Sequence, residues 1–456
     1  MSTHSISPRS GPSSRTTRRR FLAGAGAATA AIGGGTYLLN QGDRWPETSS
    51  GQVPDTSLSG NLGSGDASSG NRTDSAASPT PLASVPEGRT LVVIDLAGGN
   101  DGLATLEPYG SSRLRSIREN VMHDPEELVR IDDEMGLNPS LAGIHELGLA
   151  VVEGVGTTDG EMSHFEMENR WSYGMAATDD DFETGFFGRL CDQLDVGAPL
   201  TGLAIGTRGY AKALLAEKAV TAGLADADAG WFFRDEGPWF RQYRSSVLAM
   251  AAATGGSQLL ANARNGAERA VEFADLLGGI GGDDDDNASE QERVEAYPGN
   301  ELGRKLAGTA RLLRADTGLR VIHLTHGGFD THDGQVGTHD YLMTELNDSL
   351  VAFRNDLADT GLDQSTLIAT TSEFGRRPKS SGSGTDHGNA SVALLSGPVV
   401  PGRHGEAPSL TKLDAGDNLS PTVGMGDYYA TLASWFGVDS STVLAGTHTP
   451  IEGLLT

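Results

Sequence analysis

The chain has 456 residues, of which 37% are hydrophobic and 6% aromatic, and its formal net charge is −27. At about 150 residues per domain this length allows two or three domains, and the negative charge argues against binding to nucleic acid or to an anionic membrane. Cys191 is the only cysteine, so an internal disulfide and a zinc site built on cysteines are both excluded.

Residues 1–40 have the pattern of an export signal. Thr17 to Leu22 (TRRRFL) resemble the twin-arginine motif, and an apolar run from Phe21 to Leu39 follows. We therefore expect the twin-arginine translocation machinery as a partner, and a location outside the cell or at the outer face of the cytoplasmic membrane. The run is rich in alanine and glycine, which favours a signal peptide, and its retention as an N-terminal membrane anchor is the alternative.

Residues 41–87 are dominated by Ser, Gly, Thr, Asp and Pro. Their few apolar side chains bury too little surface to offset the entropy lost on ordering, so we expect a disordered stalk. Without the five arginines of residues 1–40, which contain no acidic residue, the charge is −32. Only five lysines occur in the whole chain. This acidic, lysine-poor composition resembles that of haloarchaeal proteins, in which surface carboxylates maintain hydration in concentrated salt.

Residues 88–456 have the pattern of an α/β domain. Apolar runs rich in β-branched residues predict strands at 90–96, 149–155, 320–325, 366–371 and 391–396. Leucines spaced from Leu342 to Leu357 predict a helix between the third and fourth strands. This βαβ unit indicates a mainly parallel sheet flanked by helices. Residues from about 175 to 318 are alanine-rich and helical in pattern, and we expect them to form a helical insertion.

Polar side chains follow the first two strands, at the edge where parallel sheets bind ligands. Asp101 lies in a glycine-rich loop after the first strand, and Ser163 and His164 precede a helix expected at 165–173. The loop lacks the G-x-G-x-x-G spacing and carries an acid, so Asp101 suits a metal better than a dinucleotide phosphate. Ser163 is either the N-cap of the helix or a reactive hydroxyl.

Imidazoles and carboxylates are concentrated after the later strands. Asp330 and His332 lie in the loop HGGFDTHD, Glu373 and Arg376 lie in SEFGRR, and His387 lies in TDHG. Mixed nitrogen and oxygen donors favour a divalent metal, zinc or manganese, with calcium or magnesium as alternatives. A core histidine or a capping acid would explain any one cluster, but together they predict a site.

In combination, these motifs resemble those of a widespread family of twin-arginine-exported proteins. The resemblance rests on GGND-G, SHF with a following Trp, GGFDTH, SEFGRR and TDHG, and it runs from about Thr90 to the C-terminus. The family is catalogued as a domain of unknown function and is grouped with the alkaline phosphatase and sulfatase superfamily. The resemblance implies an alkaline phosphatase-like fold for residues 88–456.

The superfamily resemblance also implies a metal site. Asp330, His332 and His387 would bind one metal, and Glu373 with Asp101 would bind a second. One difference concerns Glu373, which is followed by Phe374 where alkaline phosphatases have an Asp-His pair. A single metal, or a site that only binds, therefore remains an alternative to a metal pair.

Two further roles follow from the same resemblance. Ser163 would be the nucleophile, although the Cys-x-Pro-x-Arg context of sulfatases is absent from the sequence. Arg376 or Arg377 would hold a phosphate or sulfate oxygen. The sequence thus predicts an exported, divalent-metal-dependent hydrolase of phosphate or sulfate esters, whose substrate is a small molecule or a glycan. The alternative is a non-catalytic extracytoplasmic binding or surface protein that retains the fold.

Overall fold

A computed structural model describes residues 36–39, 88–174, 183–195, 197–206, 211–224, 238–279 and 284–456. The predicted signal motif at 17–22 and the predicted stalk at 41–87 lie outside these ranges. In the described part of the chain, no helix has both the length and the apolar character needed to cross a bilayer.

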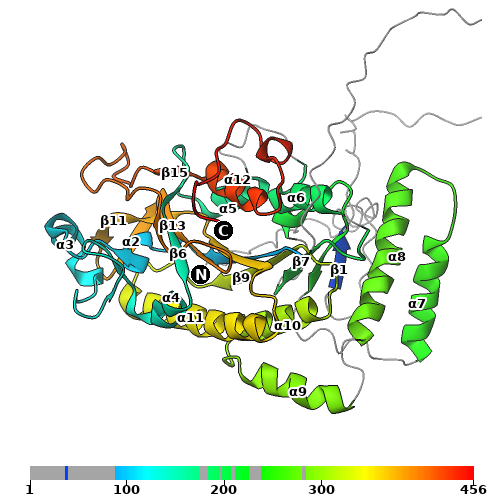
Figure 1. The fold of residues 1–456 in the computed structure, drawn as a ribbon. Helices are drawn as coiled ribbons and strands as arrows, with labels where there is room; N and C mark the ends of the chain where they lie inside the picture. The colour runs from blue at the N-terminus through cyan, green and yellow to red at the C-terminus, as the bar shows by residue number, and fades with distance from the viewer. Residues whose placement is uncertain are drawn as a thin grey trace, which may run out of the picture.

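A ten-stranded sheet forms the centre of the described structure (Figure 1). Strand order is β1-β8-β7-β9-β2-β10-β13-β6-β14, and β15 also pairs with β6. The five strands from β8 to β10 are mutually parallel, whereas β13 is antiparallel to both of its neighbours. The bounds are β1 Thr36–Leu39, β2 Thr90–Ala97, β6 Leu149–Gly156, β7 Gly202–Ile205, β8 Thr221–Leu224, β9 Val321–Gly327, β10 Thr366–Thr371, β13 Ala390–Ser396, β14 Gly402–His404 and β15 Val423–Gly424. The predicted α/β class and mainly parallel sheet are confirmed.

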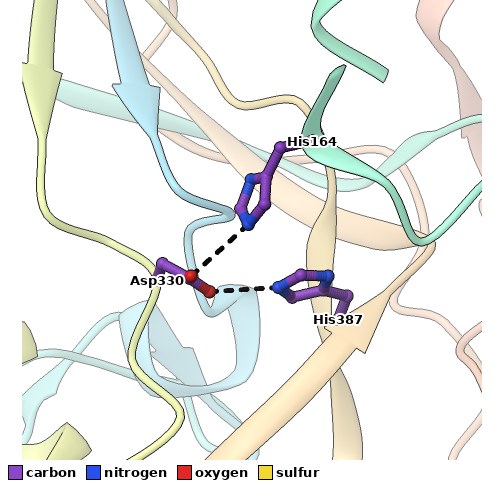
Figure 2. A group of neighbouring side chains, drawn as sticks. All are labelled: His164, Asp330 and His387. Atoms are coloured by element: carbon purple, nitrogen blue, oxygen red, sulfur yellow. Dashed lines mark hydrogen bonds and ion pairs between the residues drawn. The ribbon is translucent and has the colours of Figure 1, made fainter. Parts of the chain in front are cut away.

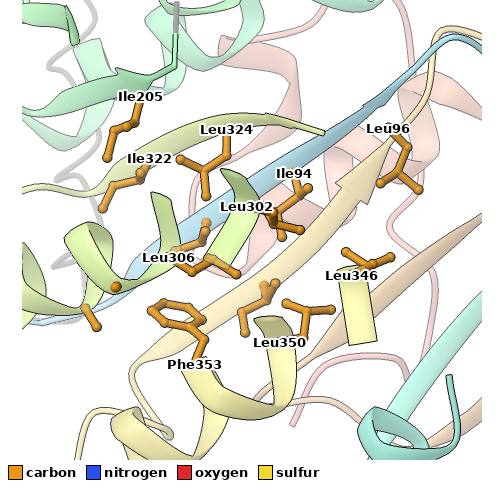
Figure 3. Packing of buried hydrophobic residues seen from close by; sticks show 14 of the residues in the cluster. Ile94, Leu96, Ile205, Leu302, Leu306, Ile322, Leu324, Leu346, Leu350 and Phe353 are labelled. Carbon is orange, nitrogen blue, oxygen red and sulfur yellow. The ribbon is translucent and has the colours of Figure 1, made fainter. Parts of the chain in front are cut away.

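One face of the sheet is covered by α4 (Ala142–Glu146), α10 (Glu301–Arg314) and α11 (Gln335–Asp359) (Figure 1). Alternate residues of β2 point to this face, where Ile94 packs among Leu306 of α10 and Phe353 of α11 (Figure 3). These three side chains are fully buried. Burial on both faces explains why β2 is apolar at almost every position and could be recognised as a strand.

The opposite face is covered by α5 (His164–Tyr173), α6 (Phe186–Leu194) and α12 (Met425–Ser434) (Figure 1). Tyr429 of α12 stacks on Phe186 with ring centroids 4.1 Å apart, and it meets Trp171 edge-on at 5.4 Å. Such aromatic pairs contribute about 0.5–1.5 kcal/mol each beyond the burial of their area. This packing fixes α5, whose first residues face the carboxyl ends of the parallel strands.

The range expected to form a helical insertion is only partly separate from the sheet. It supplies strands β7 and β8 as well as α10. Its α7 (Pro238–Ala251) and α8 (Gln258–Gly279) lie side by side at the β1 end of the sheet (Figure 1) and share a small core of Val247, Ala267 and Val271. The range also contains α6, which covers the other face of the sheet, and α9 (Asp284–Glu295).

Residues 102–137 form a small subdomain at the β6 side of the molecule. It contains α2 (Gly102–Thr105), α3 (Ser112–Arg118) and a three-stranded sheet, β3 (Leu106–Glu107), β5 (Gly136–Leu137) and β4 (Val129–Arg130). His123 ties this subdomain to α11, because its ring bonds Glu107 through Nδ1 and Asp340 through Nε2 at 2.9 Å. Burial alone would lower the pKa of His123, but the bonds to Asp340 and Glu107 raise it to about 10.

The charged His123 ring should make the protein less stable at high pH. A histidine whose pKa is raised on folding stabilises fully below its unfolded pKa of about 6.5, and that contribution is lost as the pH rises through the folded value. We expect His123→Gln to lower the free energy of unfolding by about 3 kcal/mol at pH 6 and by about 1 kcal/mol at pH 10.5, measured by urea unfolding. His404→Gln is the control; an equal loss at both pH values would contradict the assignment.

Candidate metal centre

Three side chains from distant segments point toward one another at the carboxyl ends of the parallel strands (Figure 2). Asp330 Oδ1 lies 3.0 Å from His387 Nε2, and Asp330 Oδ2 lies 3.4 Å from His164 Nε2. One potential ligand atom from each residue lies within 4.8 Å of the other two. Atoms at this separation can be bridged by a single divalent ion.

Each of these residues is held by a different element. His164 is the first residue of α5, Asp330 lies in the loop after β9, and His387 lies on β12 (Gly384–Gly388), which pairs with β11 (Gly375–Ser381). Gly98 allows the loop of Asp330 to approach. Its φ is +119°, and a Cβ at this position would lie 2.4 Å from the backbone nitrogen of Asp330.

The two histidine rings are oriented by partners on their outer nitrogens. Nδ1 of His164 lies 2.8 Å from Glu373 Oε1, and Nδ1 of His387 lies 2.9 Å from the carbonyl oxygen of Met162. Because a carboxylate and a carbonyl can only accept, each Nδ1 donates a proton to its partner. A cation bound beside Asp330 would take the lone pair of each Nε2, whereas without a cation a proton on His387 Nε2 makes the bond to Asp330. A ligating histidine in a metalloprotein is oriented in the same way.

His332 extends the group with a third imidazole. Its Nε2 lies 3.0 Å from Asp330 Oδ1 and 3.0 Å from His387 Nε2, and its Nδ1 lies 3.5 Å from Asp386 Oδ1. Two Nε2 atoms so close together repel each other as lone pairs unless a proton or a cation lies between them. Three imidazole nitrogens and one carboxylate are donors that suit zinc or manganese, so these residues fit a divalent metal.

Asp330 is kept in the charged form that a metal ligand needs. Burial by itself would raise the pKa of Asp330, but hydrogen bonds from Arg376 and His387 hold it well below its ordinary value. The Arg376 guanidinium lies 2.7 Å from Asp330 Oδ1. Asp330 is therefore both the centre of the histidine group and the charged partner of a buried arginine.

Arg376 was predicted to hold a substrate oxygen, but it lies in the interior of the protein. Its side chain is fully buried, so it is not available to hold a substrate oxygen. Besides Asp330, it donates to four backbone carbonyl oxygens, those of Gly98, Gly99, Phe329 and Thr385. Arg376 thus binds the loops after β2 and β9 to the β11–β12 hairpin. Neighbouring Arg377 is half-buried and donates through Nε to the His387 carbonyl at 3.2 Å.

Asp101 is also not brought to the histidine group. Its carboxylate is fully buried against Arg118, with nitrogen–oxygen distances of 2.8 and 3.1 Å. It caps α2 by accepting from the backbone nitrogens of Leu103 and Ala104, and it accepts a further bond from Gln335. Burial would raise the pKa of Asp101, but Arg118 outweighs this and lowers it. With its oxygens engaged in this way, Asp101 acts as a structural anion.

We expect Asp101→Asn to reduce stability without reducing metal affinity. The change leaves the buried charge of Arg118 uncompensated, which costs about 3–5 kcal/mol. The measurement pairs urea unfolding with titration of zinc into the folded protein. Asp124→Asn, which alters an exposed turn carboxylate, is the control. Loss of metal affinity with unchanged stability would instead show Asp101 to be a ligand.

Glu373 lies behind His164. Its Oε1 accepts from the Gly98 backbone at 2.7 Å as well as facing His164 Nδ1. His164, Glu168 and Glu373 form a second group with one ligand atom each within 4.8 Å. Burial and the charge of Glu373 raise the pKa of Glu168, and the same two causes raise that of Asp95 to about 8. A cation here would relieve this crowding of carboxylates, so Glu373 can serve either as a partner of His164 or as a ligand.

Ser163 stands directly before His164 as the N-cap residue of α5. Its side chain is exposed, and among the described residues it makes no capping hydrogen bond. The hydroxyl is therefore not used as a helix cap. Its role as nucleophile stays a prediction.

His164 and Glu168 were not among the predicted site residues. His164 lies in the motif Ser163-His164-Phe165, in which only the hydroxyl of Ser163 was assigned a role. The available signal was the spacing of four residues between His164 and Glu168, which places both on one face of α5. Glu168 has no other signal in the sequence.

Comparison with known proteins gives one sequence match and several structural ones. The family described as "Protein of unknown function (DUF1501)" matches residues 242–451, a range that includes Asp330, His332, Glu373 and His387 but not His164. No curated protein sequence matches the chain.

The similar solved structures include enzymes of three kinds. A lipoteichoic acid synthase from Listeria monocytogenes has a TM-score of 0.35 at 11% identity, covering 79% of this chain and 75% of that one. A sulfatase from a Pseudoalteromonas species has a TM-score of 0.32 at 12% identity, covering 80% and 73%. The alkaline phosphatase of the Antarctic bacterium TAB5 has a TM-score of 0.28 at 13% identity, covering 68% and 92%.

Proposed function

We propose that this protein is an exported hydrolase that requires a divalent metal and cleaves phosphate or sulfate esters. One observation carries the proposal: the Nε2 atoms of His164, His332 and His387 all face the carboxylate of Asp330. Each Nδ1 in turn faces an oxygen acceptor, which leaves the Nε2 lone pairs for a cation. A purely structural cluster has no need of three imidazoles oriented in this way.

Some residues of this chain would hold the metal, and others would position the ester. His164, His332, His387 and Asp330 would hold the ion, which when bound supplies Lewis-acid polarisation of an ester oxygen. Glu373 fixes the ring of His164 through Nδ1. Ser163 presents an exposed hydroxyl at the start of α5, where the helix dipole and the first backbone N–H groups favour an anion.

Metal analysis and an ester panel test this proposal together. Full-length protein purified in molar salt should contain about one equivalent of zinc or manganese. It should hydrolyse at least one of 4-nitrophenyl phosphate, 4-nitrophenyl sulfate and bis(4-nitrophenyl) phosphate. Bound metal without hydrolysis of any ester would favour a binding protein. Folded protein that takes up no metal would contradict the proposal.

The export part of the proposal depends on residues 17–22 and needs its own test. Replacement of Arg18 and Arg19 by lysine should keep the protein inside the cell, because the twin-arginine machinery reads the guanidinium pair. Arg9 and Arg15, which lie outside the motif, provide the matched double-lysine control. Equal export of both variants would contradict the twin-arginine route.

A further inference from the structure

Helix α5 presents two neighbouring faces beside the candidate metal centre. His164 and Glu168, four residues apart, lie on the face that meets Glu373. Phe165 and Asn169 have the same spacing and lie on the adjacent face. There they meet Lys212, the first residue of the short turn Lys212–Leu214, whose ammonium donates to Asn169 Oδ1 at 2.6 Å.

Phe165 follows His164 directly on α5 and exposes its ring. Its exposed fraction is 70%, the highest for a large apolar side chain among the described residues. The ammonium of Lys212 lies 5.2 Å from the centre of the ring. A single exposed apolar residue needs no explanation by itself. Here the residue follows the candidate ligand His164 directly in the chain, and an ammonium lies beside its ring.

Lys212 supplies a positive charge that the arginines do not. Arg376 is buried and engaged by Asp330 and four carbonyls, and Arg377 donates to the His387 carbonyl. Lys212 lies close enough to Glu168 for its charge to oppose the rise in the pKa of that carboxyl. Because an ammonium has three donors and Asn169 takes one, Lys212 can also bind an anion.

We propose that Phe165 and Lys212 form a subsite for the alcohol part of the substrate, and that this part is a ring with a negative charge of its own. The flat face of an aromatic or sugar ring would stack on Phe165, and its charged substituent would pair with Lys212. This inference rests on the proposed function, since it assumes that the ester group lies at the metal centre beside His164. It selects charged ring esters over simple alkyl esters.

Binding of three non-hydrolysable phosphonates to the zinc-loaded full chain tests the subsite without measuring turnover. The probes are methylphosphonate, phenylphosphonate and 4-carboxyphenylphosphonate, titrated by calorimetry. We expect wild-type protein to bind the phenyl probe about five-fold more tightly than the methyl probe, as stacking of one ring predicts. The carboxyphenyl probe should bind about five-fold more tightly again, through Lys212.

Two variants test separately which residue causes the gain in affinity from the phenyl ring and which causes the gain from the carboxylate. Phe165→Ala should remove the preference for phenyl over methyl and leave methylphosphonate affinity unchanged. Lys212→Met should remove the gain from the added carboxylate. The matched controls are Met250→Ala, an exposed apolar residue on α7, and Lys218→Met, an exposed lysine near Lys212 in sequence; both should bind like wild type.

The outcomes separate failure of the subsite from failure of the metal site. If wild-type protein binds all three probes equally, or if Phe165→Ala keeps the phenyl preference, the subsite is wrong and the metal centre stands. If Lys212→Met retains the gain in affinity from the carboxylate, Lys212 does not bind the anion and the proposed subsite is wrong. If the zinc-loaded protein binds no phosphonate at all, the proposed function and the subsite fail together.

Discussion

Replacement of Asp330 by asparagine is expected to abolish stoichiometric metal binding while the protein remains folded. Asp330 is the one carboxylate that all three histidine Nε2 atoms face. The amide has the same shape but no charge, so affinity for zinc should fall by more than about 100-fold, beyond the loss typical of partners that only orient a ligand. Ester hydrolysis should fall with it.

The fold should survive this change because Arg376 keeps its four carbonyl acceptors. The free energy of unfolding should therefore change by no more than about 1–3 kcal/mol. Metal content by mass spectrometry and affinity by calorimetry measure the effect. Asp333→Asn, an exposed carboxylate in the same loop, is the control. Undiminished zinc binding by the Asp330 variant would refute the centre described above.

Replacement of Arg376 by methionine is expected to cause a large loss of stability. The variant removes the guanidinium donors from the carbonyl oxygens of Gly98, Gly99 and Thr385. The Phe329 carbonyl oxygen keeps the bond from the Thr331 backbone nitrogen at 2.8 Å. Each buried carbonyl that loses its partner costs about 1–3 kcal/mol, so the free energy of unfolding should fall by at least about 3 kcal/mol. Urea unfolding in molar salt provides the measurement.

Two comparisons make the test of Arg376 specific. Arg376→Lys should also destabilise, because a single ammonium cannot reach donors arranged as a planar fork. Arg377→Met removes one bond to the His387 carbonyl, so its cost should be about 1 kcal/mol. A stable Arg376→Met variant that loses only substrate affinity would restore the role that the sequence predicted for this arginine.

The strands that could be predicted from the sequence are those buried on both faces. β2 and β10 are apolar runs of eight and six residues, and the sequence signal is strong because both of their faces pack against helices. The strands β7 and β8 escaped prediction because GLAI and TAGL are four residues long and rich in glycine and alanine. Their place in the sheet comes from pairing with β9 and with each other, which no local pattern encodes.

The candidate site could be predicted only in part, because contacts between distant segments are not encoded by any local pattern. Asp330, His332 and His387 lie together, and Glu373 adjoins them through His164, at the edge where the parallel strands end. That they bind metal stays a prediction. Asp101 and Arg376 were assigned to the site from their positions after strands and from the superfamily resemblance. Their partners, Arg118 and a set of loop carbonyls, decide their roles, and these contacts form only in three dimensions.

The wide separation of the site residues along the chain has a consequence for folding. His164 and Glu373 are 209 residues apart, and His387 lies on the last hairpin before β13. Such long-range contacts form late in folding. Closing a long loop lowers the entropy of the chain before the contact between its ends can stabilise the structure. A nascent chain that has emerged only as far as α11 lacks both Glu373 and His387. Tight zinc uptake would therefore mark a polypeptide in which the parallel strands β2, β9 and β10 have all been synthesised.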